Sequence, residues 1–417
     1  ALAPAAAPPH CSLLVVGGGP AGLAAAARAA ECGLAVTLVD DNPELGGQIW
    51  RGMASHRGSE AAAWANRVSA AGVAVLSQTR VVDQPAPGVL RAESPLGPIE
   101  LRYEKLMLAT GARERFLPFP GWTLPHVLGA GGLQALAKGS LPLAGKRVVV
   151  AGAGPLLLAV AAYLRQHGAA VAAVCDQASW TALARFSLAL PAKKLVQAAQ
   201  LGRSLQGVPI WMNAWPVEAR PGGVVIHRSG QFREIACDYL ACGFHLVPNT
   251  ELAALLGCAT QRGAVVVDGD QQTTIAGTYC AGEPTGIGGV ELALAQGEIA
   301  GLAAAGRAAP AALRLRREKL RRFALRLERV TSLRPELRRL PRPETLVCRC
   351  EDVPFARLQE HTAWRAAKLH TRCGMGPCQG RVCGPACEFL LGWQPDSVRP
   401  PIFPATLSAL GNEPGRF

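Results

Sequence analysis

The chain has 417 residues, of which 46 are glycine, 13 are cysteine and only 5% are aromatic. This length is too great for one hydrophobic core and predicts two or three domains. There is no run of about 18 apolar residues, so no integral membrane segment is expected. The opening ALAPAAAPPH lacks the basic and apolar regions of a secretory signal, and residues 1–10 are predicted to form a flexible tail.

The thirteen cysteines, in the absence of a signal segment, indicate a reducing compartment and predict a cytoplasmic location. In such a compartment, clustered thiols more often hold a metal than form disulfides.

The segment SLLVVGGGPAGLAAAARAAECGLAVTLVDD has the pattern of a strand, a glycine turn, a helix and a second strand. Gly17, Gly19 and Gly22 match G-x-G-x-x-G. The first glycine permits a sharp turn, the second lets the backbone approach a pyrophosphate, and the third lets the helix pack on the strand. Pro20 and Ala21 complete the turn at the start of the helix, where free N–H groups favour phosphate.

Further segments carry candidate contacts to a bound FAD. The carboxylate that ends the second strand can accept hydrogen bonds from ribose hydroxyls. GGQIWRG must pass close to a flavin, LMLATGARE leaves the first domain, and CAGEPTGIGG returns to it and begins a helix. The N-terminus of that helix can face the flavin pyrimidine edge and stabilise the anionic reduced form. The predicted contacts in these segments are Asp40, Gly47, Gln48, Thr110, Gly111, Gly282, Glu283 and Gly289.

Over residues 11–305 these motifs resemble the flavoprotein superfamily with two dinucleotide-binding folds, in particular its thioredoxin-reductase-like branch. The resemblance implies FAD in the first fold. Glu283 departs from the pattern, because the superfamily usually has Asp at this point, in contact with the ribityl or phosphate oxygens.

A second dinucleotide-binding fold is predicted within the first, from RVVVAGAGPLLLAVAAYLRQHGAAVAAVCD. Gly152 and Gly154 are present, but Leu157 stands at the third glycine position, where it is expected to force helix and strand apart. Asp176 ends the next strand, with no Arg pair to hold a 2′-phosphate. The pattern favours a structural domain, or one holding a nucleotide without redox work, over an NAD(P)H site.

Redox cysteine pairs are missing from the positions where disulfide-reducing members of the superfamily carry them. No cysteine follows Gly47 closely, and the inserted segment contains only Cys175. A thiol–disulfide oxidoreductase is therefore not expected, and the isolated cysteines are interpreted as small buried apolar residues.

Most of the formal net charge of +13 lies between Arg307 and Arg342, where thirteen Arg and Lys accompany three Glu. Apolar residues recur there at helical spacing, which predicts an amphipathic helix with a solvated basic face. A basic face for a partner or an acidic electron carrier is the alternative. Nucleic acid is not expected as a partner, because no aromatic residues interleave with the charges.

Six cysteines are concentrated near the C-terminus. Cys348 and Cys350 form C-x-C, and in an extended segment residues i and i+2 face the same side, so both sulfurs can reach one iron. The other four follow in TRCGMGPCQGRVCGPAC, among glycines that permit tight turns. Four thiolates are the ligands of a [2Fe-2S] cluster. Structural zinc, which C-x-C fits poorly, and free buried thiols are the alternatives.

This segment resembles the bacterioferritin-associated-ferredoxin-like [2Fe-2S] domain, which supplies C-x-C first and a second pair later. The resemblance to G-M-G-x-C-Q-G-x-x-C implies the ligands Cys348, Cys350, Cys378 and Cys383. Cys373 and Cys387 would then be additional thiols, although a C-x₄-C pairing of Cys373 with Cys378 stays open.

Over essentially its whole length the chain resembles the larger FAD/iron–sulfur subunit of heteromeric amino-acid dehydrogenases. That group includes D-hydroxyproline and opine dehydrogenases, archaeal proline dehydrogenase and hydrogen cyanide synthase. The motifs GGGPAGL, GGQIWR, CAGEPTGIGG and TRCGMGPCQGR carry the resemblance. It implies a D-amino-acid-oxidase-like partner subunit that oxidises the amine, an electron acceptor of unknown identity and, in some relatives, FMN at a subunit interface and a small ferredoxin-like subunit.

The chain itself is thus expected to transfer electrons and to contain no catalytic residue for substrate oxidation. Two other functions stay open: a self-sufficient NAD(P)H-dependent ferredoxin-type or nitrite-type reductase, and a redox-sensing or scaffold protein. An intact nicotinamide fold would favour the reductase, and Leu157 counts against it.

The predicted fold class is α/β, with two Rossmann-like domains, one inserted in the other, and a small helical iron–sulfur domain. The predicted domains are a tail at 1–10, the FAD domain at 11–112 and 236–305, the inserted domain at 113–235, a basic helical linker at 306–345, the [2Fe-2S] domain at 346–395 and a tail at 396–417.

Overall fold

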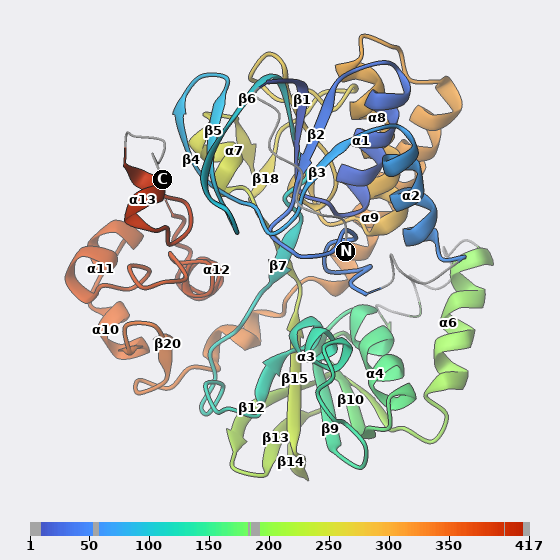
Figure 1. Ribbon diagram of the computed structural model, residues 1–417. Helices are drawn as coiled ribbons and strands as arrows, with labels where there is room; N and C mark the ends of the chain where they lie inside the picture. Colours follow the sequence, from blue (N-terminus) through green and yellow to red (C-terminus); the bar gives the residue numbers. More distant parts are fainter. Residues whose placement is uncertain (1–9, 53–57, 182–183, 185–191, 396, 412–417) are drawn as a thin grey trace. The chain divides into compact units, whose positions relative to one another are not determined.

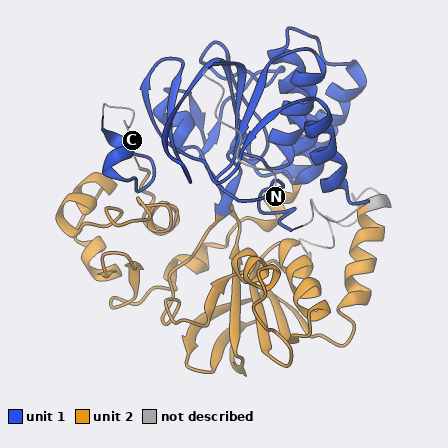
Figure 2. Cartoon of the chain, viewed as in Figure 1, with its two compact units in different colours: residues 1–113, 247–325, 397–417 blue, residues 114–246, 326–396 orange. Residues whose placement is uncertain are grey.

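The computed structural model describes residues 10–52, 58–181, 184, 192–395 and 397–411. The chain divides into two compact units, coloured separately in Figure 2. Unit 1 comprises residues 1–113, 247–325 and 397–417, and unit 2 comprises residues 114–246 and 326–396. The predicted N-terminal tail lies, except for His10, outside the described residues.

Unit 1 is built on a seven-stranded sheet with the order β3-β2-β1-β6-β5-β4, to which β19 adds by pairing with β6. The strands are β1 (Cys11–Val16), β2 (Val36–Val39), β3 (Ala74–Leu76), β4 (Arg80–Ala86), β5 (Val89–Ser94), β6 (Gly97–Leu108) and β19 (Thr278–Cys280). β6 pairs in parallel with β1 and antiparallel with β5, so it joins a Rossmann-type sheet to a meander. β1 is almost wholly buried, as expected of a central parallel strand covered on both faces.

Helices cover this sheet, as Figure 1 shows for α1, α2 and α8. They span Pro20–Glu31 (α1), Glu60–Ala70 (α2) and Val290–Ala304 (α8). α1 and α8 approach each other closely because Gly297 and Gly301 of α8 face the α1 backbone. A β-carbon at Gly297 would lie 2.2 Å from the carbonyl oxygen of Ala21, and one at Gly301 would lie 2.4 Å from that of Ala25. Only glycine fits these two positions.

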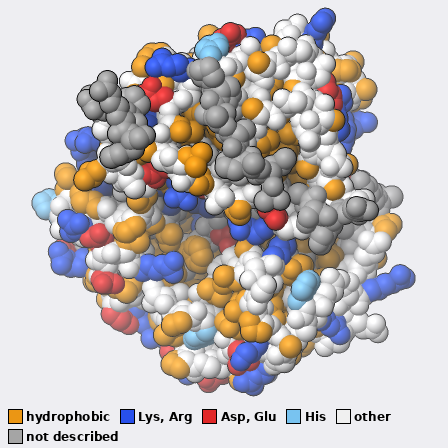
Figure 3. Space-filling view, in the orientation of Figure 1, with side chains coloured by type: hydrophobic (Ala, Val, Ile, Leu, Met, Phe, Trp, Pro, Cys, Tyr) orange, Lys and Arg blue, Asp and Glu red, His pale blue; other side chains and the backbone are white. Residues whose placement is uncertain are grey.

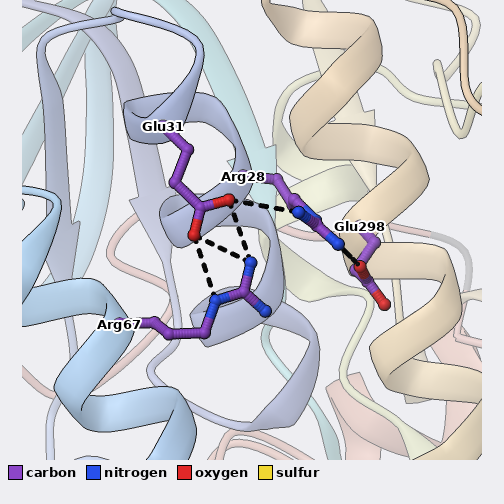
Figure 4. Close-up of polar contacts among 4 residues, drawn as sticks. All are labelled: Arg28, Glu31, Arg67 and Glu298. Carbon is purple, nitrogen blue, oxygen red and sulfur yellow. Dashed lines mark hydrogen bonds and ion pairs between the residues drawn. The ribbon is translucent and has the colours of Figure 1, made fainter.

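An ion-pair network links the three helices, as Figure 4 shows. Arg28 of α1 donates through Nε to Glu298 of α8 at 2.8 Å. Arg67 of α2 forms three hydrogen bonds with Glu31 of α1, at 3.0, 2.8 and 2.9 Å. Glu298 is buried, so loss of Arg28 would leave an uncompensated carboxylate in the core.

The C-terminal residues 397–411 pack on the meander of unit 1. The N–H of Ile402 donates to the carbonyl of Val82 at 2.8 Å, and the Thr406 hydroxyl donates to Glu93 at 2.7 Å. The short helix α13 (Leu407–Leu410) follows. The remaining elements of unit 1 are α7 (Glu251–Leu255), β17 (Thr260–Gln261), β18 (Ala264–Val265) and the 3₁₀ turn η1 (Glu283–Thr285).

Unit 2 contains a five-stranded parallel sheet with the order β11-β10-β9-β15-β8 and a three-stranded antiparallel sheet of β12, β13 and β14. The strands are β8 (Val127–Gly129), β9 (Arg147–Ala153), β10 (Ala170–Asp176), β11 (Ile210–Met212), β12 (Ala214–Arg220), β13 (Gly223–Arg228), β14 (Gln231–Ala236) and β15 (Tyr239–Phe244). The helices are α3 (Ala130–Lys138), α4 (Leu156–Gln166) and α6 (Ala192–Ser204).

The inserted part of the chain ends later than the sequence suggests. β15 pairs in parallel with β9, so the chain returns to unit 1 after residue 246 and not after 235. The strand pattern of YLACGF does not show which of two similar sheets it joins. Where the chain passes between the units, β7 (Ala112–Glu114) and β16 (Leu246–Pro248) pair.

A 21-residue helix, α9 (Ala311–Thr331), occupies most of the predicted basic linker. Its apolar stripe, which includes Leu320 and Leu327, is half-buried, and Arg322 pairs with Glu318 one turn earlier at 3.1 Å. Basic side chains lie at many separate places on the face that Figure 3 shows, among hydrophobic and acidic ones.

The cysteine-rich segment belongs to unit 2 and has a small core of its own, with Val347, Leu358, Trp364 and Ala367 buried. Its elements are β20 (Leu346–Cys348), β21 (Val353–Pro354), α10 (Phe355–Gln359), α11 (Trp364–Thr371) and α12 (Cys383–Leu391), preceded by the 3₁₀ turn η2 (Pro335–Arg339). The predicted α/β class, with two Rossmann-like folds and a small helical C-terminal domain, is confirmed.

We predict that Gly301→Ala destabilises the chain by about 1–3 kcal/mol, the usual effect of overpacking a close contact. Its new β-carbon would collide with Ala25. Gly202→Ala is the matched control, because Gly202 is also helical and faces open space. That change should stabilise by about 0.5–1 kcal/mol. Urea unfolding of both variants measures the difference, and equal effects would contradict the proposed close approach.

Candidate functional site

The first glycine turn has the geometry of a phosphate-binding turn. Gly17 has a φ of 107°, and a β-carbon there would lie 2.2 Å from the carbonyl oxygen of Ala109. A β-carbon at Gly22 would lie 1.8 Å from the carbonyl oxygen of Gly17. Around Gly19, in contrast, the nearest atom is the Gly47 Cα at 4.0 Å. The first and third glycines are therefore needed for internal packing, and the second leaves space where a ligand can approach the backbone.

The carboxylate of Asp40 lies against this turn at the end of β2. One oxygen accepts a hydrogen bond from the N–H of Gly18, and the other accepts from the N–H of Asn42 at 2.7 Å. Burial raises the pKa of Asp40 above its ordinary value, and the two backbone hydrogen bonds oppose that shift. Asp40 therefore holds the turn in shape in addition to the ribose contact predicted from the sequence.

The GGQIWRG segment lies beside the turn. The N–H of Gly46 donates to the carbonyl of Gly18 at 2.8 Å, which brings Gly47 next to Gly19. Gln48 accepts a hydrogen bond from Arg51 at 2.9 Å.

Arg51 was not predicted as a site residue. Its guanidinium also donates to Asn42 at 2.9 Å and so connects the segment to the Asp40 loop. The signal for it was present in the sequence, because Arg51 belongs to the same motif as Gln48.

Thr110 and Gly111 stabilise the point where the chain leaves the first fold. The Thr110 hydroxyl donates to the carbonyl of Asn249 at 2.6 Å, and the Asn249 side chain donates to the carbonyl of Thr110 at 2.9 Å. The N–H of Asn249 donates to the carbonyl of Gly111 at 3.0 Å. These bonds join the outgoing and returning strands beside Ala109.

Gly282 and Glu283 bring the start of α8 to the start of α1. A β-carbon at Gly282 would lie 2.9 Å from that of Ala21. The Glu283 carboxylate accepts hydrogen bonds from Gly288 at 3.0 Å and from Gly289 at 2.9 Å. Burial raises the pKa of Glu283, against the effect of these bonds. The longer side chain of glutamate thus reaches the start of α8. It accepts a hydrogen bond from the N–H of Gly289, a residue that was predicted from the sequence to contact the flavin.

Four of the six C-terminal cysteines, Cys348, Cys373, Cys383 and Cys387, belong to the small core of the cysteine-rich segment. The sulfurs of Cys348, Cys373 and Cys383 are within 4.8 Å of one another, and all three residues are buried. Cys378 forms thiol contacts with both Cys383 and Cys350. The four predicted ligands therefore form a continuous series from the buried Cys348 through Cys383 and Cys378 to the exposed Cys350.

The two remaining thiols, Cys373 and Cys387, are 0% exposed and contact each other. Cys373 also touches Cys348 and Cys383. We predicted Cys373 to be an additional thiol, with its pairing with Cys378 left open. Its position beside two predicted ligands makes Cys373 an alternative to Cys350 as the fourth ligand.

Glycines allow the loop around the thiols to fold tightly. A β-carbon at Gly376 would lie 2.4 Å from that of Cys350, and one at Gly374 would lie 2.7 Å from the ring of Trp364. Gly374 and Gly380 both have positive φ, which glycine adopts without strain.

Trp122 connects the C-x-C strand to the rest of unit 2. Its indole N–H donates to the carbonyl of Leu346 at 2.6 Å, and the Arg349 guanidinium lies 5.8 Å from the ring centroid. Arg372, one of the cations near the thiols, pairs with Glu351 at 2.6 Å. Its charge is therefore offset by a carboxylate from the same loop.

Residues 11–305 match the family model described as pyridine nucleotide-disulphide oxidoreductase. The chain belongs to this family. The A subunit of opine oxidase from Rhizobium meliloti (strain 1021) is 31% identical, over 96% of this chain and 98% of that one. The HcnB subunit of hydrogen cyanide synthase from Pseudomonas aeruginosa is also 31% identical, with the same coverage.

Among solved structures, L-proline dehydrogenase from P. horikoshii has a TM-score of 0.69 and 20% identity, covering 96% of this chain and 79% of that chain. At this identity the likeness shows the fold. The predicted resemblance to a subunit of heteromeric amino-acid dehydrogenases is confirmed by the two relatives, both of which are named as subunits.

As a member of the pyridine nucleotide-disulphide oxidoreductase family, the chain is an oxidoreductase, and the family match indicates FAD binding. Burial raises the pKa of Cys175 to about 12, far above the range of a reactive thiolate. Among the described residues, no helix is both long and apolar enough to span a membrane.

We predict that the free energy of unfolding of the wild-type chain, relative to Glu283→Gln, decreases as the pH rises from 5 to 8. Because burial raises the folded-state pKa of Glu283, its contribution is complete below the ordinary pKa and is lost as pH rises through the raised value. Urea unfolding at several pH values tests this, and a difference that grows with pH would contradict it. Glu360→Gln, at an exposed position, is the control.

Proposed function

We propose that this chain is the electron-transfer subunit, carrying FAD and a [2Fe-2S] cluster, of a heteromeric FAD-dependent dehydrogenase that oxidises an amino or imino acid. The main support is that a dinucleotide turn with an open second glycine and a compact group of six thiols occur in one chain. The relatives add a second line of support. The opine oxidase and hydrogen cyanide synthase subunits match over nearly their full length, and the alpha subunit of sarcosine oxidase from Corynebacterium sp. matches over part of its length.

In this proposal the first fold holds FAD. Gly19 leaves the turn open for the pyrophosphate, Asp40 is placed for the ribose, and Arg51 supplies a cation beside the same loop. The first-turn N–H groups of α1 have no side-chain acceptor at Gly19, the N-cap residue, and are available to phosphate oxygens. FAD, when bound, can take up electrons and pass them on singly or in pairs.

The cluster would be held by Cys348, Cys350, Cys378 and Cys383. These thiols form one contact series that runs from the core to the surface, whereas Cys387 lies on the far side of Cys373. Deprotonated thiols are the ligands of such clusters, and neighbouring backbone N–H groups and cations tune them. Arg349 lies between two of the proposed ligands in the sequence, and its guanidinium lies 5.8 Å from the centroid of the Trp122 ring.

The amine would be oxidised on a partner subunit resembling D-amino-acid oxidase, and this chain would carry electrons away from it. A small ferredoxin-like subunit and FMN at a subunit interface remain predictions from the resemblance, and a cytoplasmic location remains a prediction from the cysteine content.

We predict that the purified chain contains about two iron atoms, as a Cys₄ [2Fe-2S] cluster requires. Cys350→Ser should deplete iron and bleach the cluster absorbance, because it removes a proposed ligand. Cys387→Ser, a buried thiol outside the contact series, is the matched control and should keep both.

Elemental analysis and visible spectra distinguish the alternatives. If Cys373→Ser loses the cluster while Cys350→Ser keeps it, the fourth ligand is Cys373. Zinc at one atom per chain without iron would contradict the cluster itself.

We predict that the isolated chain does not oxidise amino or imino acids, and that adding its partner subunit restores substrate-dependent dye reduction. The reason is that, in this proposal, the amine pocket belongs to the partner subunit and this chain carries only the electrons. Co-expression with the genes beside it, followed by a panel of imino and amino acids, measures the activity. Comparable turnover by the isolated chain would contradict the proposed division of labour.

A further inference from the structure

The two dinucleotide folds of this chain contain the same turn in two different environments. In each, an aspartate at the end of the second strand accepts a hydrogen bond from the turn, at a separation of 22 residues: Asp40 from Gly18, and Asp176 from Gly154. In each, the first glycine approaches a neighbouring strand, since a β-carbon at Gly152 would lie 2.1 Å from the carbonyl oxygen of Gly243. The inserted fold therefore keeps the framework of a dinucleotide site.

Leu157, at the third glycine position, does not disrupt this framework. Leu157 is buried, and the residue opposite its side chain in the sheet is Gly243. A β-carbon at Gly243 would lie 3.1 Å from the Leu157 Cδ2 atom. The expectation that leucine forces helix and strand apart is wrong. The absence of a side chain at Gly243 leaves the space that the Leu157 side chain needs. Leu157 therefore does not decide whether a nucleotide can reach this turn.

That feature is the surroundings of the second glycine. Around Gly19 the nearest atom to a new β-carbon is 4.0 Å away. Gly154 has a φ of 87°, and a β-carbon there would lie 3.2 Å from the Thr331 Cγ2 atom. Thr331 is the last residue of α9 and is 3% exposed. The surface that a pyrophosphate must approach is thus covered by the chain itself.

Buried hydrogen bonds hold this segment in place. Gln177, which is 0% exposed, donates to the carbonyls of Thr331 at 3.2 Å and Ser332 at 2.9 Å, and it accepts from the N–H of Arg334 at 2.9 Å. His245, at the end of β15, also bonds the carbonyl of Thr331. Both residues stand at the carboxyl ends of the parallel strands, where open α/β sheets bind their ligands.

The covering segment is built into the fold. Three residues after Arg334, Leu337 is fully buried in the same core as Trp122 and Phe244, and the chain then continues to the cysteine-rich segment. To uncover Gly154, the protein would have to withdraw Leu337 from that core and leave a cavity there, which is strongly unfavourable for a buried leucine. The segment is therefore a permanent part of the fold.

We infer that residues 331–334 fill the dinucleotide site of the inserted fold, so that Thr331 excludes NADH and NADPH as electron donors. The pyridine nucleotide implied by the family description does not fit the residues present in this fold. The site instead anchors the segment that leads to the thiols. This inference involves neither the cluster nor a partner subunit, and it stands or falls independently of the proposed function.

Nucleotide binding to the full chain gives the first test. Calorimetric titration of the FAD-saturated chain, in which the first fold is occupied, with NADH, NADPH and ADP-ribose should show no saturable binding at millimolar ligand. Leu157→Gly, which restores the third glycine, should also show none, because Thr331 still covers Gly154. Saturable binding by the wild type, or binding gained in Leu157→Gly alone, would overturn the inference.

Hydrogen exchange followed by mass spectrometry gives a second test that needs no ligand. The amide of Arg334 should be protected in the wild type and should exchange at least about tenfold faster in Gln177→Ala, because its buried acceptor is lost. Gln206→Ala, at an exposed position, is the control and should leave it unchanged. Amides of β9 report any general loss of structure. Rapid exchange at Arg334 in the wild type would show that the segment does not fill the site.

Discussion

The close approach of backbone to backbone at a few glycines is the constraint on which unit 1 depends. Gly22 lets α1 begin directly against the turn at Gly17, and Gly297 and Gly301 let α8 lie against α1. These contacts leave no space for a side chain, so the position of one helix fixes that of the other. The starts of both helices are therefore held by packing, together with the hydrogen bonds that Asp40 accepts from Gly18 and Glu283 accepts from Gly288 and Gly289.

The same turn serves two purposes in this chain. In the first fold, the second glycine faces open space, and its nearest neighbour is the Gly47 backbone. In the inserted fold, the corresponding glycine is covered by Thr331, and the polar groups bond the chain's own backbone. A ligand and a peptide segment can satisfy the same donors and acceptors, because both present oxygens to them. Dinucleotide-fold topology therefore does not show by itself that a nucleotide binds.

The thiols show how a short segment can hold reactive groups without a large core. Cys373 and Cys387 pack among Trp364 and Val347, while Cys350 remains at the surface. In the proposed function, the gradient from buried to exposed sulfur would place the cluster near solvent on one side, where electrons could leave. Trp122 ties this small core to the inserted fold, so the inserted fold has a mechanical role even without a nucleotide.

The sequence by itself determined the features that depend on local geometry: the glycine turns, the aspartates that end the second strands, and the grouping of six thiols. These follow from spacing along one or two elements. Tertiary structure alone decided that β15 joins the second sheet, that Glu283 binds the start of α8, and that Thr331 covers Gly154. Each of these brings together residues from separate elements, and no periodicity within either element records which partner it will meet. The sequence therefore locates the two dinucleotide turns, and only packing decides which one is free.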